Sequence, residues 1–296
     1  ILAYSIVNQV GFMVTGIGIG TELALNGAAA HAFAHIIYKA LLLMSAGSVL
    51  FMTGKRKCTD LGGLIRTMPV TALCGIIGAL SISSFPLTSG FVTKSMISAA
   101  AGHQHLELVW YLLAAASAGV FLHAGIKFPW FVFFQKDSGL RPDEPPWNMR
   151  AAMVLFAVLC IAIGVAPGPL YALLPFPVDY EPYTAGHVVF YLQLLLFSGL
   201  AFFLMLGWLK RTLTITLDVD WFYRRLGPVA ARRLDAIADA GWDGLVSGVG
   251  RSVRAIATGV HRLHGPGGIL ARPWPTGSMA FWATVMLALY SILSYL

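Results

Sequence analysis

Residues 69–102 read PVTALCGIIGALSISSFPLTSGFVTKSMISAAAG, and this apolar stretch decides how many times the chain crosses a membrane. As one straight helix its 34 residues would measure about 51 Å. A single span needs only about 20 residues, yet two spans and a turn need more than this stretch provides. Pro86 and Gly90 lie in its middle and are expected to break the helix.

The rest of the chain is equally apolar. Hydrophobic residues make up 57% of the 296 residues and charged ones only 11%, against about 25% in a soluble domain. This composition excludes a cytosolic enzyme. We predict an all-α, polytopic bundle of transmembrane helices, whose other spans are residues 1–20, 28–52, 108–134, 151–170, 188–209 and 277–296.

The distribution of charge indicates that residues 69–102 cross once, as one discontinuous helix. With a single crossing, 17 of the 20 lysines and arginines fall on one side, in residues 53–68, 135–150 and 210–276. The opposite side then carries no lysine or arginine. We expect the protein to lie in the inner membrane of the cell. The positive-inside rule then predicts that the basic loops are cytoplasmic. The net charge of +7 then reflects topology and lipid contact, and no nucleic-acid partner is expected.

The beginning of the chain predicts that further helices precede it. Residues 1–20 start with Ile1, contain no charge and lack the features of a signal peptide. We therefore expect missing membrane helices, on the same polypeptide or on a separate one.

Three lysines remain inside the predicted spans, where no aspartate or glutamate accompanies them: Lys39, Lys94 and Lys127. A lysine at the centre of a bilayer costs about 2.5–3.5 kcal/mol, so such residues usually face the bundle interior and mark ion paths. His31 and His35 precede Lys39 at a spacing of four, which places all three on one helix face. His123 and Lys127 repeat that spacing. Titratable groups along buried faces are what a proton relay requires.

Other interpretations of these residues stay open. Lys127 lies near the cytoplasmic end of its span, where its ammonium can reach the lipid headgroups. His31 can be a structural residue near a membrane edge. His31 and His35 have a spacing that can bind zinc, but Lys39 on the same face would repel the metal and no third ligand is evident. We expect neither a metal nor a cofactor.

Several motifs, in order, resemble those of antiporter-like membrane subunits. They are LAYSIVNQVG at residues 2–11, HAFAHIIYKALLLMSAGSV at 31–49 and GALSISSFPLTSGFVTK at 78–94. This family includes the proton-pumping chains of respiratory complex I and the Mrp-type cation/proton antiporters, and the resemblance covers about residues 1–170. A further segment, DVDWFYRR at 218–225, resembles the tail of the D-type chains of Mrp antiporters.

The resemblance implies a proton-translocating subunit of a multisubunit monovalent cation/proton antiporter. His35 and Lys39 fall on central relay positions, Lys94 on the terminal titratable residue, and Lys127 near a basic position of the next helix. The family unit has two inverted repeats, and the buried glutamate and broken-helix lysine of the first repeat are not present here. The alternatives are a proton-pumping subunit of a complex I-like assembly, with redox chemistry in partner subunits, or a non-conducting scaffold.

Residues 210–276 are predicted to form an amphipathic helix along the cytoplasmic interface, followed by a membrane anchor at 277–296. Gly241, Gly244, Gly248 and Gly250 are expected to loosen this helix. It either braces neighbouring subunits or rests on lipid.

Overall fold

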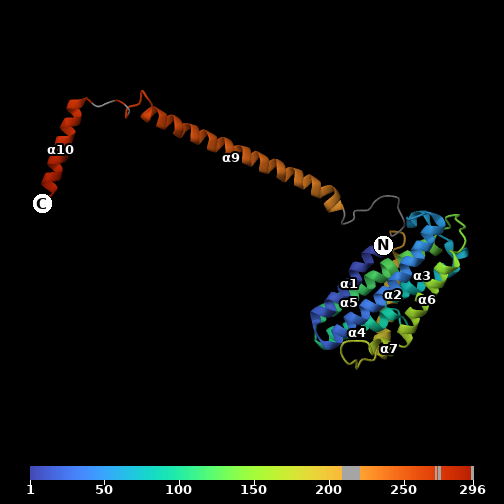
Figure 1. Cartoon of the computed structure of the whole chain (residues 1–296). Helices are drawn as coiled ribbons and strands as arrows, with labels where there is room; N and C mark the ends of the chain where they lie inside the picture. The colour runs from blue at the N-terminus through green and yellow to red at the C-terminus, as the bar shows by residue number, and fades with distance from the viewer. Residues whose placement is uncertain (209–220, 271, 273–274, 295–296) are drawn as a thin grey trace. The chain divides into compact units, whose positions relative to one another are not determined.

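The computed structural model describes residues 1–208, 221–270, 272 and 275–294. The chain divides into two compact units, Ile1–Thr214 and Ile215–Leu296, and each is described by itself. Every regular element in these described residues is helical, as predicted (Figure 1).

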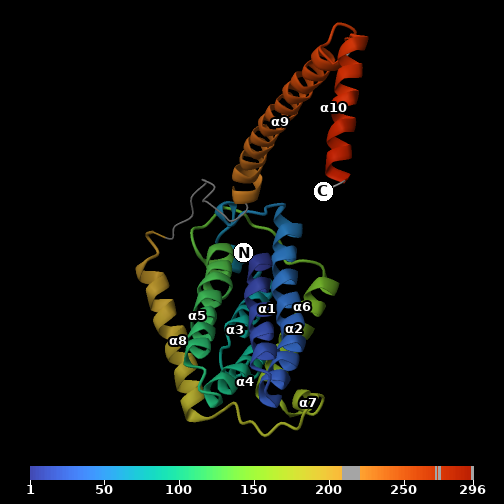
Figure 2. The ribbon, with the colours of Figure 1, turned by 90° about the vertical axis from the view of Figure 1, so that its left-hand side faces the viewer.

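The first unit is a bundle built around one long helix. Its principal helices are α1 Leu2–Ile19, α2 Glu22–Thr53, α3 Pro69–Ile82, α4 Ser89–His103, α5 Glu107–Val120, α6 Trp147–Val165, α7 Gly168–Tyr171 and α8 Ala185–Leu204. The short 3-10 turns are η1 Cys58–Asp60 and η2 Leu64–Arg66, and α5 continues into the π-helical segments η3 Phe121–Lys127 and η4 Trp130–Phe134. Helix α2 packs against α1, α3, α4 and α6, and Figure 2 shows it beside α1.

Helix boundaries differ from the predicted spans where a capping residue or a proline intervenes. Helix α2 begins at Glu22 because the side chain of Thr21 accepts a hydrogen bond from the backbone amide of Ala24. Thr184 caps α8 in the same way. Helix α6 ends at Val165, before the predicted end at Leu170, because Pro167 cannot continue it.

The predicted discontinuity lies between α3 and α4. Ser84 and Leu87 adopt left-handed backbone angles, with φ of 61° and 69°. Such angles are costly for residues other than glycine and persist where the surrounding structure imposes them. At Gly90 a Cβ atom would lie 1.8 Å from the carbonyl oxygen of Ser81, so only glycine lets the two half-helices approach.

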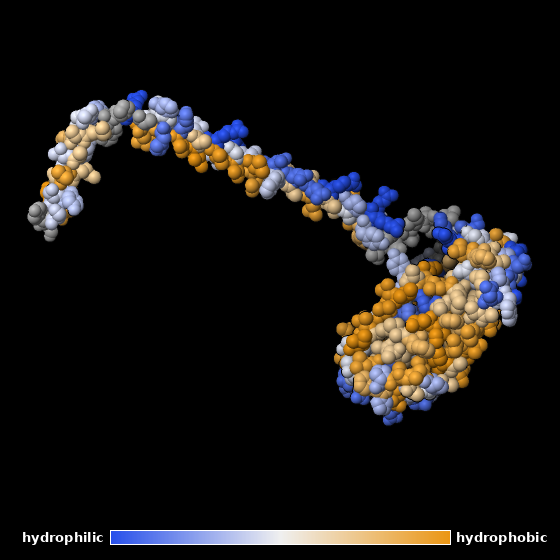
Figure 3. All heavy atoms as spheres, in the orientation of Figure 1, coloured by the Kyte–Doolittle hydropathy of each residue, from blue (hydrophilic) through white to orange (hydrophobic). Residues whose placement is uncertain are grey.

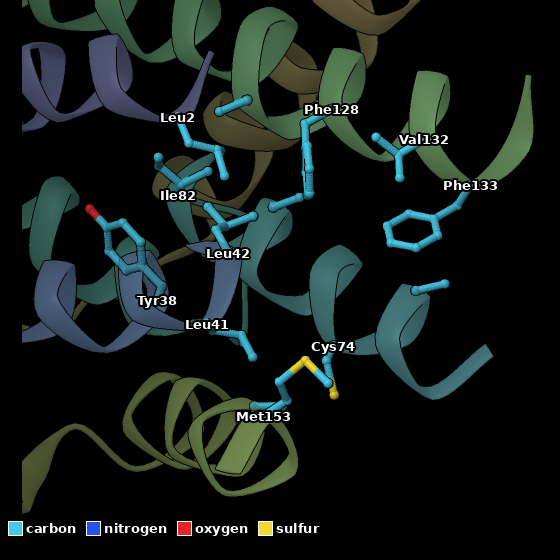
Figure 4. Close-up of a cluster of buried hydrophobic side chains, with 14 of the residues drawn as sticks. Leu2, Tyr38, Leu41, Leu42, Cys74, Ile82, Phe128, Val132, Phe133 and Met153 are labelled. Atoms are coloured by element: carbon cyan, nitrogen blue, oxygen red, sulfur yellow. The ribbon is translucent and has the colours of Figure 1, made fainter. Parts of the chain in front are cut away.

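The apolar core surrounds the middle of α2. Tyr38, Leu41 and Leu42 are fully buried and pack with Ile82 and Phe133 (Figure 4). Between helices in a lipid environment this close packing, more than hydrophobic burial, stabilises the bundle. The opposite face of α2 exposes Phe33, Ile36 and Leu43, and much of the visible side of the first unit is apolar (Figure 3).

A carboxylate from a distant loop caps the beginning of α3. Glu144 accepts hydrogen bonds from the backbone amides of Val70, at 2.5 Å, and Thr71, at 3.2 Å. It also accepts one from the hydroxyl of Thr71 at 2.7 Å. Met68 at the N-cap offers no side-chain hydrogen bond, so Glu144 satisfies amides that the helix leaves unpaired.

The second unit contains η5 Phe222–Leu226, α9 Gly227–His264 and α10 Thr276–Ser294. Helix α9 is continuous for 38 residues, about 57 Å, through the four glycines that are expected to loosen it. Each glycine costs about 1 kcal/mol relative to alanine, which weakens a helix without interrupting it. Figure 3 shows apolar and polar residues on different sides of α9. Lys210, Arg211, Asp218 and Asp220, part of the predicted basic stretch and tail motif, lie outside the described residues.

Six helices of the described chain are long and apolar enough to cross a membrane. They are α1, α2, the continuous run Glu107–Phe134, α6, α8 and α10. The half-helix α3 is apolar but shorter, which agrees with a discontinuous seventh crossing made with α4.

Candidate functional site

The predicted face of α2 points into the bundle and meets α1 and α4. His31 is fully buried, Lys39 is 4% exposed and His35 is half-buried. His31 lies more than two turns after the start of α2 at Glu22, on the face that packs into the bundle.

The imidazole of His31 connects three helices through hydrogen bonds. Its Nδ1 lies 2.9 Å from the hydroxyl of Thr93 on α4. Its Nε2 lies 3.2 Å from Oε1 of Gln9 on α1 and 3.3 Å from the hydroxyl of Tyr38. Tyr38 in turn donates to Oε1 of Gln9 at 2.8 Å. Polar groups of α1, α2 and α4 thus form one buried network.

Either nitrogen of His31 can carry the proton in this network. When the Thr93 hydroxyl donates to the carbonyl of Ser89, 3.1 Å away, it accepts from Nδ1 of His31. When it donates to Nδ1 instead, Nε2 carries the hydrogen and donates to Gln9. A neutral imidazole has one donor and one acceptor, so a ring bonded on both sides can take a proton at one nitrogen and release it at the other.

Lys94 is fully buried next to Thr93, just after the helix break. Its ammonium donates a hydrogen bond of 2.7 Å to the carbonyl oxygen of Ile82, the last residue of α3, and lies 4.8 Å from the ring centre of Phe12. The C-terminal end of a helix carries partial negative charge, and an aromatic face also attracts a cation. The break therefore provides the environment that holds a buried ammonium group.

Lys39 and His35 continue the polar line along α2. The ammonium of Lys39 donates to the hydroxyl of Ser5 on α1. The ring of His35 lies 5.4 Å from that of Tyr38 and 6.3 Å from that of His31. Its buried Nε2 has no hydrogen-bond partner within the described part of the chain. His35 also interacts electrostatically with Lys39 and with Lys94, so it lies near both charges.

The second predicted pair, His123 and Lys127, comes from a different helical segment. Both residues are half-buried on η3, where the helix widens into π-type turns. His123 interacts electrostatically with Lys127 and Lys39. Single π turns inside helices often mark functional positions, and this distortion was not predicted. Because Lys127 is partly exposed, its ammonium group can still reach the lipid headgroups, as the sequence analysis allowed.

Gln9, Tyr38 and Thr93 belong to the site although no role was predicted for them. The available signal was the presence of a polar side chain in an apolar span, because such groups seek a hydrogen-bond partner when they are buried. Their spacing gives no indication that they meet, since they come from three different helices.

The fold and this site are similar to those of antiporter-like membrane proteins. Residues 1–122 match the family model described as NADH:quinone oxidoreductase/Mrp antiporter, TM. The resemblance deduced from the motifs is therefore confirmed over these residues, and the chain is a multi-pass membrane protein.

Individual relatives agree with this family. The chain is 33% identical over 172 residues to the D chain of a Na(+)/H(+) antiporter of Alkalihalophilus pseudofirmus, a match covering 58% of this chain and 35% of that protein. It is 31% identical over 174 residues to the A/B component of a probable K(+)/H(+) antiporter of Rhizobium meliloti, covering 56% and 17%. The chain thus spans about a third or less of the length of these curated relatives.

A solved structure shares the fold. The structure of the Mrp complex from Dietzia sp. DQ12-45-1b contains a chain that superimposes with a TM-score of 0.61 at 25% sequence identity. The superposition covers 93% of this chain and 31% of that one.

Proposed function

We propose that this chain is a proton-translocating subunit of a multisubunit monovalent cation/proton antiporter, with protons relayed among Lys94, His31, His35 and Lys39. The observation that carries the proposal is the buried imidazole of His31, which is hydrogen-bonded toward α4 at one nitrogen and toward α1 at the other. Thr93, adjacent to Lys94, is one of its partners.

Electrostatic repulsion provides a means of coupling the two buried lysines. At an effective dielectric constant of 20, two unit charges 10 Å apart interact by roughly 1.7 kcal/mol. That energy changes a protonation equilibrium by more than tenfold. Protonation at Lys39 therefore favours release at Lys94, and His35 and His31 carry the proton between them.

The surroundings of the chain are part of the proposal. The protein lies in the inner membrane of the cell, with the basic loops cytoplasmic, in contact with lipid. The counter-charge for the buried lysines comes from neighbouring membrane subunits, because the buried side chains in the described residues include no aspartate or glutamate.

A proton-pumping subunit of a complex I-like assembly is the second candidate, since the matching family model includes NADH:quinone oxidoreductase. The relay residues are the same in both cases, and the source of energy differs. A non-conducting scaffold is the third candidate, and the long amphipathic α9 favours it. A scaffold tolerates methionine at Lys39 and Lys94 but does not tolerate deletion of α9.

The test replaces Lys39 and Lys94 by alanine, one at a time, in the assembled complex. Proton movement is followed with a pH-sensitive dye in inside-out membrane vesicles, and assembly is measured on native gels. Lys55→Ala, at an exposed loop lysine, is the matched control. We expect both buried-lysine variants to assemble and lose transport. Normal transport in both assembled variants would reject proton translocation by this route.

A further inference from the structure

A second group of polar side chains lies near Lys94. Thr93, which contacts His31, precedes Lys94 on α4, and this second group begins at Ser98, which follows it. Ser98 lies one helical turn after Lys94 on α4, so the two side chains share a face. The hydroxyl of Ser98 is 3.2 Å from the hydroxyl of Tyr191 on α8. Ser98 is 9% exposed and Tyr191 is 2% exposed, so this contact is buried.

Aromatic packing fixes the position of the Tyr191 phenol. Its ring meets Phe91 edge-on at 5.4 Å and Phe190 at 5.3 Å. These edge-to-face contacts fix the orientation of the ring. Its hydroxyl therefore stays close to the hydroxyl of Ser98. A hydroxyl in such apolar surroundings needs a polar partner, and Ser98 supplies it.

From Tyr191 the line continues to the end of the bundle. His187 lies one turn before Tyr191 on α8, in the first turn of that helix and half-buried. Its Nδ1 is 3.4 Å from the hydroxyl of Tyr180, which follows α7, and Tyr180 also interacts electrostatically with Tyr191. Burial raises the pKa of the Tyr180 phenol, so it stays protonated and able to donate.

The loop that carries Tyr180 is held against the bundle. The side-chain amide of Asn26 donates to the carbonyl of Phe176 at 2.9 Å and accepts from its backbone amide at 3.1 Å. Tyr171 donates to the carbonyl of Val92 at 2.8 Å. In Figure 2 this loop passes along the end of the bundle where α4 and the beginning of α8 lie. Residues 166–184 contain no lysine or arginine.

We propose that Ser98, Tyr191, Tyr180 and His187 form the proton path between Lys94 and the water at this end of the bundle. The inference rests on the proposed function, because it requires Lys94 to exchange protons. Each hydroxyl accepts a proton on its oxygen and releases the one it carried, so none changes its net charge. His187 takes the proton at Nδ1 and gives one to water from Nε2.

The test compares Tyr191→Phe with Tyr183→Phe in the complete complex. Both rings pack on Phe91, at 5.4 Å and 5.2 Å, but the Tyr183 hydroxyl donates to the carbonyl of Gly164 and lies outside the path. We expect Tyr191→Phe to slow proton movement by about tenfold or more, within the contribution of a positioned proton-transfer group. Its solvent deuterium isotope effect should rise, because proton transfer becomes rate-limiting. Tyr183→Phe should match the unmodified protein in both measurements.

Two further variants keep the outcome decisive. Ser98→Ala should slow transport as Tyr191→Phe does, and the double variant should be no slower than either, since both remove the same step. If Tyr191→Phe does not assemble, Ser98→Ala provides the comparison. Transport and isotope effects equal to those of Tyr183→Phe, with Lys94→Ala inactive, would overturn the path alone. Transport that persists in Lys94→Ala would overturn the path as well, and if it also persists in Lys39→Ala it would overturn the proposed function.

Discussion

The ammonium group of Lys94 on α4 donates a 2.7 Å hydrogen bond to the carbonyl oxygen of Ile82, the residue at which α3 ends. One contact therefore satisfies an unpaired carbonyl of one half-helix and stabilises a buried charge on the other. Lys94 therefore has two roles: it supports the helix break, and it carries a buried charge. A variant at Lys94 can affect either role.

Lys94→Arg separates these roles. An arginine keeps the positive charge and can donate to Ile82, but it does not release its proton at physiological pH. We expect the complex to assemble while proton movement falls by at least about a hundredfold. Dye-based transport in vesicles and native gels measure the two effects, with Lys55→Arg as control. Transport at the unmodified rate would mean that Lys94 only supports the helix break.

Gly90→Ala is expected to disrupt the break itself. Its new methyl group would lie 1.8 Å from the carbonyl oxygen of Ser81, so the half-helices must move apart. Forcing atoms into packed space costs typically about 1–3 kcal/mol. Thermal unfolding of the purified protein in detergent should show a lower midpoint. Gly102→Ala, also on α4, is the control because its nearest neighbour would be Trp110 at 3.9 Å; an equal loss in both variants would contradict this reasoning.

Glu144→Ala is expected to loosen the beginning of α3. It removes a carboxylate that accepts from the amides of Val70 and Thr71, and loss of a helix cap costs about 0.5–2 kcal/mol. Hydrogen exchange of those two amides should accelerate. Asp143→Asn, at a neighbouring position, should leave their exchange unchanged. Slow exchange in Glu144→Ala would show that another group caps the helix.

The loop that begins at Asp137 should stay folded in mild acid. Hydrogen bonds from Arg141 and from the amide of Gly139, together with Arg66, hold the pKa of Asp137 well below its ordinary value. A lowered folded-state pKa adds stability at neutral pH, which is lost only as the pH falls through that lowered value. Protection of the Gly139 amide should therefore persist from about pH 7 to about pH 4. Asp137→Ala, which has no side-chain acceptor, should lack it throughout. A loss of protection near the ordinary aspartate pKa would contradict this.

Much of the fold could be predicted because lipid imposes simple rules on sequence. Apolar length gives the spans, and the distribution of lysine and arginine favours a single crossing by residues 69–102. The break at Pro86 follows from local chemistry. The amphipathic helix α9 was predicted from its periodicity, whereas the π-helical turns of η3 were not, because no residue pattern signals them.

The candidate site was predictable only along one helix. A spacing of four placed His31, His35 and Lys39 on one face of α2, since that periodicity belongs to a single helix. The partners Gln9 and Thr93 come from α1 and α4, and no sequence spacing specifies how those helices cross α2. Contacts between helices depend on packing in three dimensions, so they could not be predicted from sequence spacing.

The two basic loops of the first unit, residues 53–68 and 135–150, differ in their suitability for engineering. Gly54–Lys57 is exposed and follows the left-handed end of α2, whereas the loop containing Glu144 is tied to the start of α3. An affinity tag or a fluorophore inserted between Arg56 and Lys57 would therefore leave the capping bonds of α3 in place. The same insertion beside Glu144 would detach its carboxylate, so purification and labelling of this protein should use the first loop.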